Sequence, residues 1–367
     1  MANLTKEEML RIVNENISKL SNKEYTLYFY VLDTKGNPSY PLEYIYKTAL
    51  ILSKRGHKVV MLHEEPEFVG VSDWLGEEYS NLPHMNVNTD NVEVSPSDFI
   101  FIPDIFANVM LQTKKLPCKR VVIVQNYENI CEFMPISQTF ESLGIIDVIA
   151  TSNKNVEGVK SYFPNVRTHV VPPSIMPVFR ENNEPRKLLI NILAREQSDA
   201  NKIVKPFYWR NPAYRWVSFV DLRGLSKEAL AEALRESAIT LWVDDKTDFG
   251  VSLLEAINCG GVVIGKLPEN IQEWMAKDDT PTEGVLWVNN LEEMVNALPN
   301  VINCWLHDTV PSDVYEKQKQ LRDLFTDKIQ ELEIIETYEK NIINRRLKDF
   351  EETKIDIENN VLKTKEE

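Results

Sequence analysis

Two patterns of apolar residues alternate along the first part of the chain. Short apolar runs of strand length are followed by segments in which apolar residues recur every three or four positions, as in amphipathic helices. The first segments predicted in this way are a helix over residues 5–20, a strand over 25–32, a helix over 41–55 and a strand over 58–62. This order predicts a βαβ unit with parallel strands and a right-handed crossover.

The same alternation continues to the end of the sheet-forming part of the sequence. The next short apolar runs are residues 99–102, 120–124 and 148–150, and a second series follows at 188–193, 216–219, 239–243 and 261–264. Because these runs are almost entirely apolar, each sheet is predicted to be covered on both faces. A proline-rich stretch over residues 170–177, followed by a charged one over 180–187, separates the two series.

The predicted fold class is therefore α/β, with two Rossmann-like lobes whose parallel sheets face a cleft. We expect a first lobe over residues 1–174, a second over 175–310, and a long helical tail over 311–367. In such sheets ligands lie beyond the carboxyl ends of the strands. One apolar stripe between Leu321 and Ile342 indicates that the tail packs on the body, and a homodimer through this C-terminal helix stays open.

Composition narrows the range of functions. A formal charge of -15 over 367 residues opposes attraction of the whole protein to polyanions such as DNA. The sequence has no recognisable signal peptide and no apolar run of membrane-spanning length, so we expect a cytoplasmic protein. Four scattered cysteines and five scattered histidines form no ligand cluster, and we expect neither a bound metal nor any other required cofactor.

Residues 244–265 carry the most specific chemical pattern. A strand ends at Val243, a helix begins near Val251, and a glycine pair ends that helix before the next strand. A helix that begins just past a strand offers free backbone N–H groups, which bind phosphate well. One turn into this helix, Glu255 could accept hydrogen bonds from ribose or sugar hydroxyls, or could simply complement the helix dipole.

This stretch resembles the second-lobe motif of the group 1 (family 4) glycosyltransferases, E-G-F-G-x-x-x-x-E-A-x-x-C-G-x-x-V-I. The matching residues are Phe249, Gly250, Leu253, Leu254, Glu255, Ala256, Cys259, Gly260, Val263 and Ile264. The resemblance implies a GT-B fold, a UDP- or GDP-sugar as co-substrate, and transfer of a hexose or pentose to an acceptor hydroxyl with retention of configuration. It also implies that Glu255 contacts the ribose of the nucleotide. Thr247 replaces the glutamate that faces the donor sugar in that family.

Weaker matches to the same family lie over residues 50–60 and 145–179. In the second lobe, the resemblance assigns Arg195 and Lys202 to the diphosphate, with Lys205 as a substitute for Lys202. Two cations at the end of a strand suit a diphosphate leaving group, although exposed surface cations have the same appearance in a sequence. The predicted donor site comprises Arg195, Lys202, Thr247, Phe249, Gly250, Val251, Ser252, Leu253 and Glu255.

Loops after the strands of the first lobe are predicted to bind the acceptor. Gly36 and Gln125 are the candidate acceptor-binding residues, and Asp104 and Asn126 are the candidate catalytic residues. Asp104 is the acidic residue placed to accept a proton from the acceptor hydroxyl, although a helix N-cap is an equally good interpretation. The predicted partners are a nucleotide sugar and a saccharide or other hydroxyl acceptor.

Two alternatives remain. Residues 202–223 interleave basic and aromatic side chains, which could hold a nucleic acid strand and direct the enzyme to a modified base in DNA. Aromatic side chains that fill the core are the favoured explanation of that pattern. In the second alternative, replacement of the sugar-facing glutamate by Thr247 leaves a non-catalytic binding or assembly module.

Overall fold

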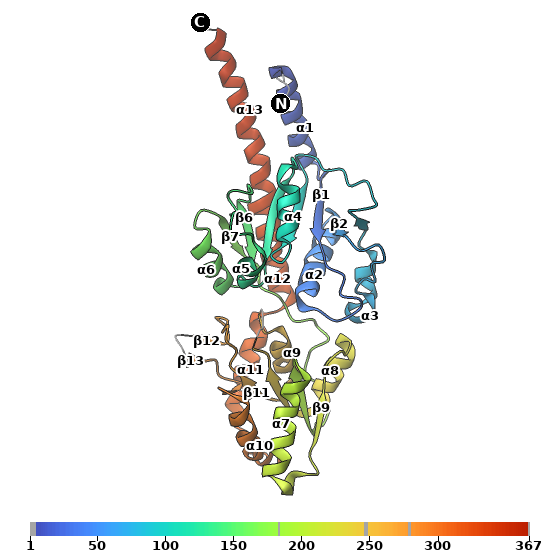
Figure 1. Ribbon diagram of the computed structural model, residues 1–367, viewed down its shortest axis with the longest axis vertical. Coiled ribbons are helices and arrows are strands. Elements are labelled where there is room, and N and C mark those ends of the chain that lie inside the picture. The colour runs from blue at the N-terminus through green and yellow to red at the C-terminus, as the bar shows by residue number, and fades with distance from the viewer. Residues whose placement is uncertain (1–4, 183, 246–248, 278–279, 366–367) are drawn as a thin grey trace. The chain divides into compact units, whose positions relative to one another are not determined.

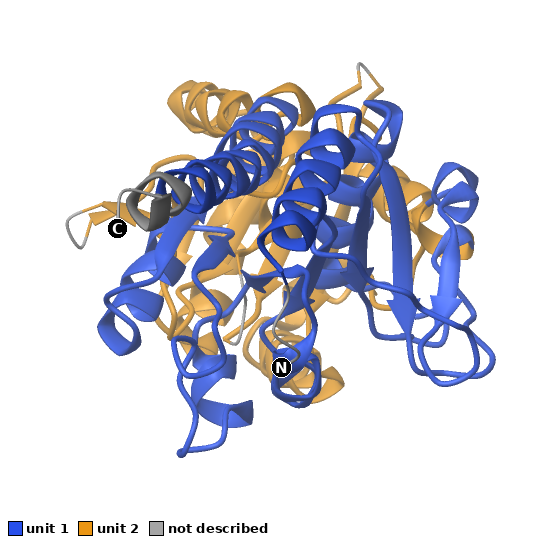
Figure 2. Cartoon of the chain, turned by 90° about the horizontal axis from the view of Figure 1, so that it is seen from above, with its two compact units in different colours: residues 1–72, 76–171, 331–367 blue, residues 73–75, 172–330 orange. Residues whose placement is uncertain are grey.

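The computed structural model describes residues 5–182, 184–245, 249–277 and 280–365, with side chains described up to residue 359. The chain divides into two compact units, coloured separately in Figure 2. Unit 1 contains residues up to 72, residues 76–171 and the segment from 331 onward, and unit 2 contains residues 73–75 and 172–330. Each unit is built around its own sheet.

The sheet of unit 1 is parallel throughout, with the strand order β3-β2-β1-β4-β5-β6-β7. Its strands are β1 (Thr26–Tyr30), β2 (Lys58–His63), β3 (His84–Asn86), β4 (Phe99–Pro103), β5 (Lys119–Val124), β6 (Asp147–Ala150) and β7 (Arg167–Val170). Between these strands in the sequence lie α2 (Tyr40–Lys54), α3 (Ser72–Leu75), η1 (Glu77–Asn81), α4 (Ala107–Gln112), η2 (Thr113–Lys115), α5 (Glu128–Phe133) and α6 (Asn153–Tyr162). Residues 73–75 of α3 belong to unit 2. All residues of the central strands β1 and β4 are buried, as the apolar runs predicted.

Two segments from opposite ends of the sequence lie side by side in unit 1. Helix α1 (Lys6–Ser21) begins with a capping box between Thr5 and Glu8, and α13 (Asn344–Lys365) packs along it (Figure 1). Between α12 (Asp327–Ile334) and α13, the π-helical segment η4 (Ile335–Ile343) buries Tyr338 against Phe29 and Phe101 of the sheet. The C-terminal segment from residue 331 therefore belongs to the packing of unit 1.

An ionic contact fixes η4 to the end of α2. Glu339 accepts hydrogen bonds from Arg55 Nε at 2.7 Å and Nη2 at 3.0 Å, and its Oε1 lies 2.9 Å from His57 Nε2. On the other side of the imidazole ring, His57 Nδ1 lies 2.9 Å from the Tyr25 hydroxyl. The apolar packing of the C-terminal segment is thus supplemented by the polar contact of Glu339 with Arg55 and His57, called the clasp below.

The main sheet of unit 2 is also parallel, with the order β14-β11-β10-β8-β9. Its strands are β8 (Lys187–Ala194), β9 (Ser218–Asp221), β10 (Ser237–Val243), β11 (Val262–Lys266) and β14 (Leu286–Val288), and β12 (Ala276–Lys277) pairs with β13 (Thr280–Pro281). Its helices are α7 (Gln197–Arg210), η3 (Pro212–Tyr214), α8 (Lys227–Glu236), α9 (Val251–Cys259), α10 (Leu291–Leu306) and α11 (Ser312–Leu324). Strand β9 begins two residues later than predicted, because Val217 N–H is bonded to Tyr214 O in the turn at η3.

Candidate functional site

Arg195 and Asp244 meet at the carboxyl edge of the unit 2 sheet. Ala194 pairs with Val243 at the ends of the neighbouring strands β8 and β10, so the next residue of each strand lies at the same level. Arg195 donates from Nε to Asp244 Oδ1 at 2.9 Å and from Nη2 to Oδ2 at 3.1 Å. This forked geometry is the one that a guanidinium also offers to a phosphate. With 52 % of its side chain exposed, Arg195 is accessible at this edge.

A second ion pair lies at the next strand of the same edge. Lys266 is the last residue of β11, and its ammonium group contacts the Asp245 carboxylate. Lys266 was not among the residues selected from the sequence, although its position at the end of an apolar run is the signal that would have identified it. The edge formed by β8, β10 and β11 therefore alternates cations and carboxylates.

Helix α9 begins at this edge, and none of the described side chains caps its first turn. Gly250, its N-cap residue, has φ 83° and ψ 32°, a left-handed conformation that suits glycine, and the first turn contains no acidic residue. Leu253 and Leu254 donate their N–H groups to Gly250 O. The hydroxyl of Ser252 accepts a hydrogen bond from Trp242 Nε1 at 2.9 Å. The positive end of the α9 dipole is thus not neutralised by a side chain of its first turn.

An aromatic cluster supports the approach to α9. Phe249 packs edge-on against Phe325, with ring centroids 5.5 Å apart, and also contacts Trp274. Trp274 Nε1 donates to Phe249 O at 2.8 Å, which ties the loop after β11 to the residue preceding Gly250. Phe249, which the sequence assigned to the donor site, has the role of fixing the start of α9.

Glu255 lies inside unit 2 and forms a buried ion pair. Its side chain is fully buried, and Lys227 Nζ, with 3 % of its side chain exposed, lies 2.7 Å from Glu255 Oε1. The ammonium group also lies 5.5 Å from the centre of the Phe179 ring. Lys227 is the first residue of α8, directly after the N-cap Ser226, and it was not selected from the sequence. A lysine at the first position of a helix that follows a sheet edge was the available signal.

The remaining donor-site candidates are less closely placed. Lys202 lies within α7, where its ammonium group is 2.8 Å from Asp199 of the same helix and 62 % of its side chain is exposed. Val251 and Leu253 are buried in the first turn of α9. Thr247 lies outside the described residues. Arg195 and the start of α9 are therefore the predicted donor-site features at the carboxyl ends of β8 and β10, whereas Glu255 is buried further along α9.

In unit 1, Asp104 holds the loop that follows β5. It lies just after β4, and its Oδ2 accepts the N–H groups of Gln125 at 2.8 Å and Asn126 at 2.9 Å, while Asn129 Nδ2 donates to Oδ1 at 3.2 Å. The helix N-cap interpretation is wrong, because Phe106 is the N-cap residue of α4. Burial raises the pKa of Asp104 to about 6, although the backbone hydrogen bonds oppose this shift.

Gln125 and Asn126 lie next to each other in that loop. Gln125 Nε2 donates to Pro41 O at the start of α2 at 2.9 Å, and Asn126 Oδ1 accepts the N–H of Glu128 at 3.0 Å. Asp104, Gln125 and Asn126 are thus brought together at the carboxyl ends of β4 and β5. Gly36 lies in a different loop, the one that follows β1.

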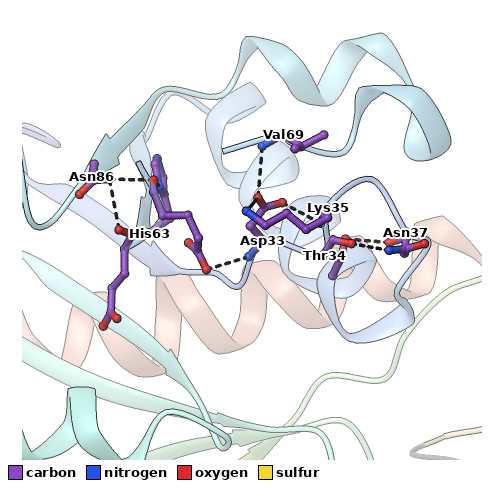
Figure 3. A network of polar contacts seen from close by, with 9 residues as sticks. Asp33, Thr34, Lys35, Asn37, His63, Val69 and Asn86 are labelled. Atoms are coloured by element: carbon purple, nitrogen blue, oxygen red, sulfur yellow. Dashed lines mark hydrogen bonds and ion pairs between the residues drawn. The ribbon is translucent and has the colours of Figure 1, made fainter. Parts of the chain in front are cut away.

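The Gly36 loop is a tight turn braced by Asp33, as Figure 3 shows. Lys35 and Gly36 have φ values of 53° and 77°, and the Asn37 N–H is bonded to Thr34 O. The Asp33 carboxylate accepts the Lys35 N–H at 2.9 Å and its Nζ at 2.8 Å, and the Val69 N–H of the next loop at 3.4 Å. Burial opposes ionisation of Asp33, but these hydrogen bonds outweigh it and lower the pKa of the carboxyl.

The described part of the chain shows neither a cluster of metal-ligating side chains nor a helix suited to crossing a membrane. Its His, Cys, Asp and Glu side chains form no group of three or more that could hold a metal ion. Within the same residues, no helix combines the length and apolar character needed to cross a membrane.

Known proteins resemble this chain in structure and not in sequence. No protein-family model and no curated protein sequence matches it. Sucrose-phosphate synthase from Thermosynechococcus elongatus matches 86 % of this chain and 98 % of its own, with a TM-score of 0.62 and 12 % identity. A trehalose-6-phosphate synthase, studied for glycosyl transfer with retention, matches 86 % and 99 % with a TM-score of 0.59 and 10 % identity.

A third similar structure is an α-glucosyltransferase in complex with UDP and a 13-mer DNA containing an HMU base. It matches 83 % of this chain and 94 % of its own, with a TM-score of 0.51 and 12 % identity. Identities this low show the fold alone. These structural matches, the two parallel sheets and the C-terminal segment that packs in unit 1 together show that the chain has the α/β GT-B fold predicted from its sequence.

Proposed function

We propose that this protein is a glycosyltransferase that moves a sugar from a nucleoside-diphosphate sugar to an acceptor hydroxyl, with retention of configuration. The observation that carries the proposal is that Arg195 follows β8 while α9, which no described side chain caps, begins after the neighbouring strand β10. Backbone N–H groups and a guanidinium are the partners that a diphosphate requires. The fold and the resemblance to the group 1 glycosyltransferases support the same assignment.

In the proposed reaction, the bond between the anomeric carbon and the diphosphate oxygen breaks and the acceptor oxygen bonds to that carbon. The bonding electrons leave with the nucleoside diphosphate, so negative charge grows on the leaving oxygen. Arg195 and the first turn of α9 stabilise this charge. The acceptor hydroxyl loses its proton as its oxygen bonds to the anomeric carbon, and the leaving diphosphate oxygen takes up that proton. Arg195 exchanges its contact with Asp244 for one with phosphate. Lys202 is proposed as a second, more distant cation.

Glu255 and Lys227 are proposed to bind the nucleoside portion. The resemblance assigns Glu255 to the ribose, and the 2.7 Å contact with Lys227 fixes the orientation of its carboxylate. In unit 1, we propose that Gly36, Gln125 and Asn126 contact the acceptor. Asp104 positions Gln125 and Asn126, because its carboxylate oxygens already accept hydrogen bonds from this loop.

Thermal-shift titration tests the proposal with the purified chain. UDP, GDP and their common hexose and pentose conjugates are added at increasing concentration, because a ligand bound by the folded state alone raises Tm. We expect one nucleotide series to raise Tm, and Arg195→Met to abolish most of the rise. The absence of a shift with every nucleotide sugar would instead favour a non-catalytic binding or assembly module.

A second candidate function is transfer to a modified base in DNA. Most aromatic side chains of residues 202–223 fill the core, as the sequence favoured: Phe207 is fully buried, and Tyr208 donates to Val217 O. Two tryptophans depart from this pattern, since Trp209 is 73 % exposed and Trp216 is 59 % exposed. Exposed indoles near basic residues can stack on unpaired bases.

A mobility-shift assay distinguishes this candidate from transfer to a saccharide. Duplexes with and without a hydroxymethylated pyrimidine are compared at two salt concentrations, because phosphate contacts weaken as salt rises. Salt-dependent binding that Trp209→Ala and Trp216→Ala weaken together would support a DNA acceptor. Absence of binding to both duplexes would leave the saccharide or another small hydroxyl compound.

A further inference from the structure

Two amide side chains in the loop after β11 have buried polar atoms with no hydrogen-bond partner among the described residues. Gln272 is fully buried, and neither its Oε1 nor its Nε2 has a partner among the described residues. Asn270, two positions earlier, is 9 % exposed, and its buried Nδ2 likewise has no partner within the described part of the chain. An amide that leaves water without regaining hydrogen bonds costs free energy, so buried polar groups are normally paired.

Another buried glutamine in unit 2, Gln318, is paired through its amide nitrogen, although its Oε1 also has no partner among the described residues. Gln318 is 1 % exposed, and its Nε2 donates to Gly261 O at 3.1 Å and to Gly284 O at 3.0 Å. That side chain links α11 to two loops of the sheet and has a clear structural role. Gln272 makes no comparable contact with the described residues, although it is equally buried. Its amide therefore lacks the structural explanation that accounts for Gln318.

The position of Gln272 places it at the candidate donor site. It lies two residues before Trp274, whose indole donates to Phe249 O, and Phe249 directly precedes the N-cap of α9. Its loop follows β11, which pairs with β10, and β10 leads to α9 at the same sheet edge. The loop that contains Gln272 is thus hydrogen-bonded, through Trp274, to the residue that precedes the start of α9.

We propose that Gln272, assisted by Asn270, binds hydroxyl groups of the donor sugar. This inference rests on the proposed function and names the part of the donor that the loop after β11 recognises. A carboxamide carries both a donor and an acceptor, as does each sugar hydroxyl, whereas a diphosphate offers acceptors only. The amide therefore matches a sugar better than it matches the phosphates that lie at α9.

The proposal also accounts for a departure of the sequence from the family it resembles. Thr247 stands where those enzymes have the glutamate that faces the donor sugar. Gln272 would supply the missing sugar contact from the neighbouring loop. A site built to pair with a hydroxyl rejects analogues that lack it, because its buried polar groups are then left unpaired. Gln272 would thus determine which sugar is accepted.

The test compares Gln272→Met with the matched control Gln318→Met. For each purified variant, Tm is measured without ligand, and affinity is measured for the nucleoside diphosphate and for its sugar conjugate. We expect Gln272→Met to keep or raise Tm without ligand, because an apolar side chain of similar size removes an unpaired amide. Affinity for the diphosphate should be unchanged, while affinity for the sugar conjugate should fall at least tenfold relative to the wild type.

The control has the opposite profile. Gln318→Met should lower Tm, because Gly261 O and Gly284 O lose their donor, and should leave the ratio of the two affinities unchanged. Asn270→Leu should reproduce the effect of Gln272→Met on that ratio more weakly. These three variants separate a sugar contact from a purely structural role.

Each contrary result has a distinct meaning. If Gln272→Met lowers Tm and preserves the affinity ratio, the amide holds a structural water and the inference is overturned. The inference also fails if the wild type binds diphosphate and sugar conjugate equally well. If the wild type binds neither compound from any nucleotide series, the proposed function itself fails and the inference falls with it.

Discussion

The carboxyl edges of the two sheets use their charged side chains in different ways. In unit 1, Asp33 and Asp104 accept backbone N–H groups from neighbouring loops and so hold those loops in shape. In unit 2, the charged side chains pair with one another across strands and helices, as Arg195 does with Asp244 and Lys227 with Glu255. A carboxylate that binds backbone is committed to structure, whereas the exposed Arg195 can exchange its partner for a ligand.

This difference indicates which charged side chains can change their contacts when a substrate binds. The unit 1 edge is preorganised by buried carboxylates, so its loops present fixed shapes. The unit 2 edge combines an exposed pair with a buried one and an uncapped helix, which suits the binding of a charged ligand. Substitutions at these pairs and braces should differ in their effect on stability, from the buried pair of unit 2 down to its exposed cation.

Breaking the buried pair of unit 2 should have the largest effect. Lys227→Met leaves the Glu255 carboxylate buried without its ammonium partner, and the free energy of unfolding should fall by about 3–5 kcal/mol. Lys227→Met combined with Glu255→Met should recover most of this loss, because apolar residues can replace a buried pair. Nucleotide binding should nevertheless remain lost in the double variant.

Urea denaturation and nucleotide titration measure these effects. The control is Lys187→Met, which breaks an exposed pair with Glu236 and should cost less than about 1 kcal/mol. Equal stability of Lys227→Met and Lys187→Met would show that the buried pair does not behave as described.

Removing the Asp104 carboxylate, which holds the loop after β5 in unit 1, should have the next largest effect on the free energy of unfolding. Asp104→Ala leaves the N–H groups of Gln125 and Asn126 without an acceptor, and should cost about 2–3 kcal/mol. Because burial raises the pKa of Asp104 from 3.8 to about 6, its ionised form is disfavoured in the folded state. The stability gained from the tighter binding of this proton in the folded state is therefore present below about pH 4 and is lost as pH rises through about 6.

Asp104→Asn removes this titration and keeps an acceptor oxygen. Urea denaturation between pH 4 and 7 should show the wild type losing stability relative to Asp104→Asn as pH rises. A difference that is constant across this range would mean that Asp104 titrates normally.

The clasp between η4 and α2 should depend on pH in the opposite direction. Hydrogen bonds from Arg55 and, to a smaller extent, from His57 lower the pKa of Glu339 to about 2, although burial opposes the shift. The contribution of Glu339 is thus present above about pH 4.5 and is lost as pH falls toward 2. Glu339→Gln should cost about 1–2 kcal/mol at pH 7, and this cost should shrink as pH falls from about 4.5 toward 2. A cost independent of pH would contradict the ionic clasp.

Removing the exposed cation of unit 2 should affect stability least. Arg195→Met should change the free energy of unfolding by less than about 1 kcal/mol, because half of the side chain is exposed. Its affinity for a nucleoside diphosphate should fall by about tenfold to a hundredfold, since charge-assisted hydrogen bonds are lost. Lys202→Met should weaken this affinity less than Arg195→Met does. The reverse order would transfer the main cationic role to Lys202.

Much of the fold could be predicted because its signals are local. Apolar runs such as residues 99–102 become the fully buried β4, and the spacing of Thr5 and Glu8 produces the capping box of α1. The packing of the segment after residue 331 in unit 1 could not be read in this way, because its stripe shows that a helix is covered but not by what. Contacts such as Tyr338 with Phe101 join residues more than 200 positions apart.

For the candidate site, the sequence predicted which residues follow the strand ends, but it did not predict the ion pairs that these residues form. Arg195 and the start of α9 follow from apolar runs that end at known residues, so the sequence could locate them. The partners Lys227 and Lys266 were missed, because a lysine's position at a helix start or strand end does not reveal the carboxylate that the tertiary fold brings beside it. That the buried Gln272 amide has no hydrogen-bond partner among the described residues also depends on the tertiary structure, and no spacing of residues in the sequence reveals it.

The position of a bound nucleoside diphosphate tests the central claim most directly. The measurement is a crystal structure of the chain with the diphosphate that gives the largest rise in Tm. We predict that its phosphates contact Arg195 and the backbone N–H groups of the first turn of α9. Phosphates bound away from this turn, with the Arg195–Asp244 pair intact, would contradict the account.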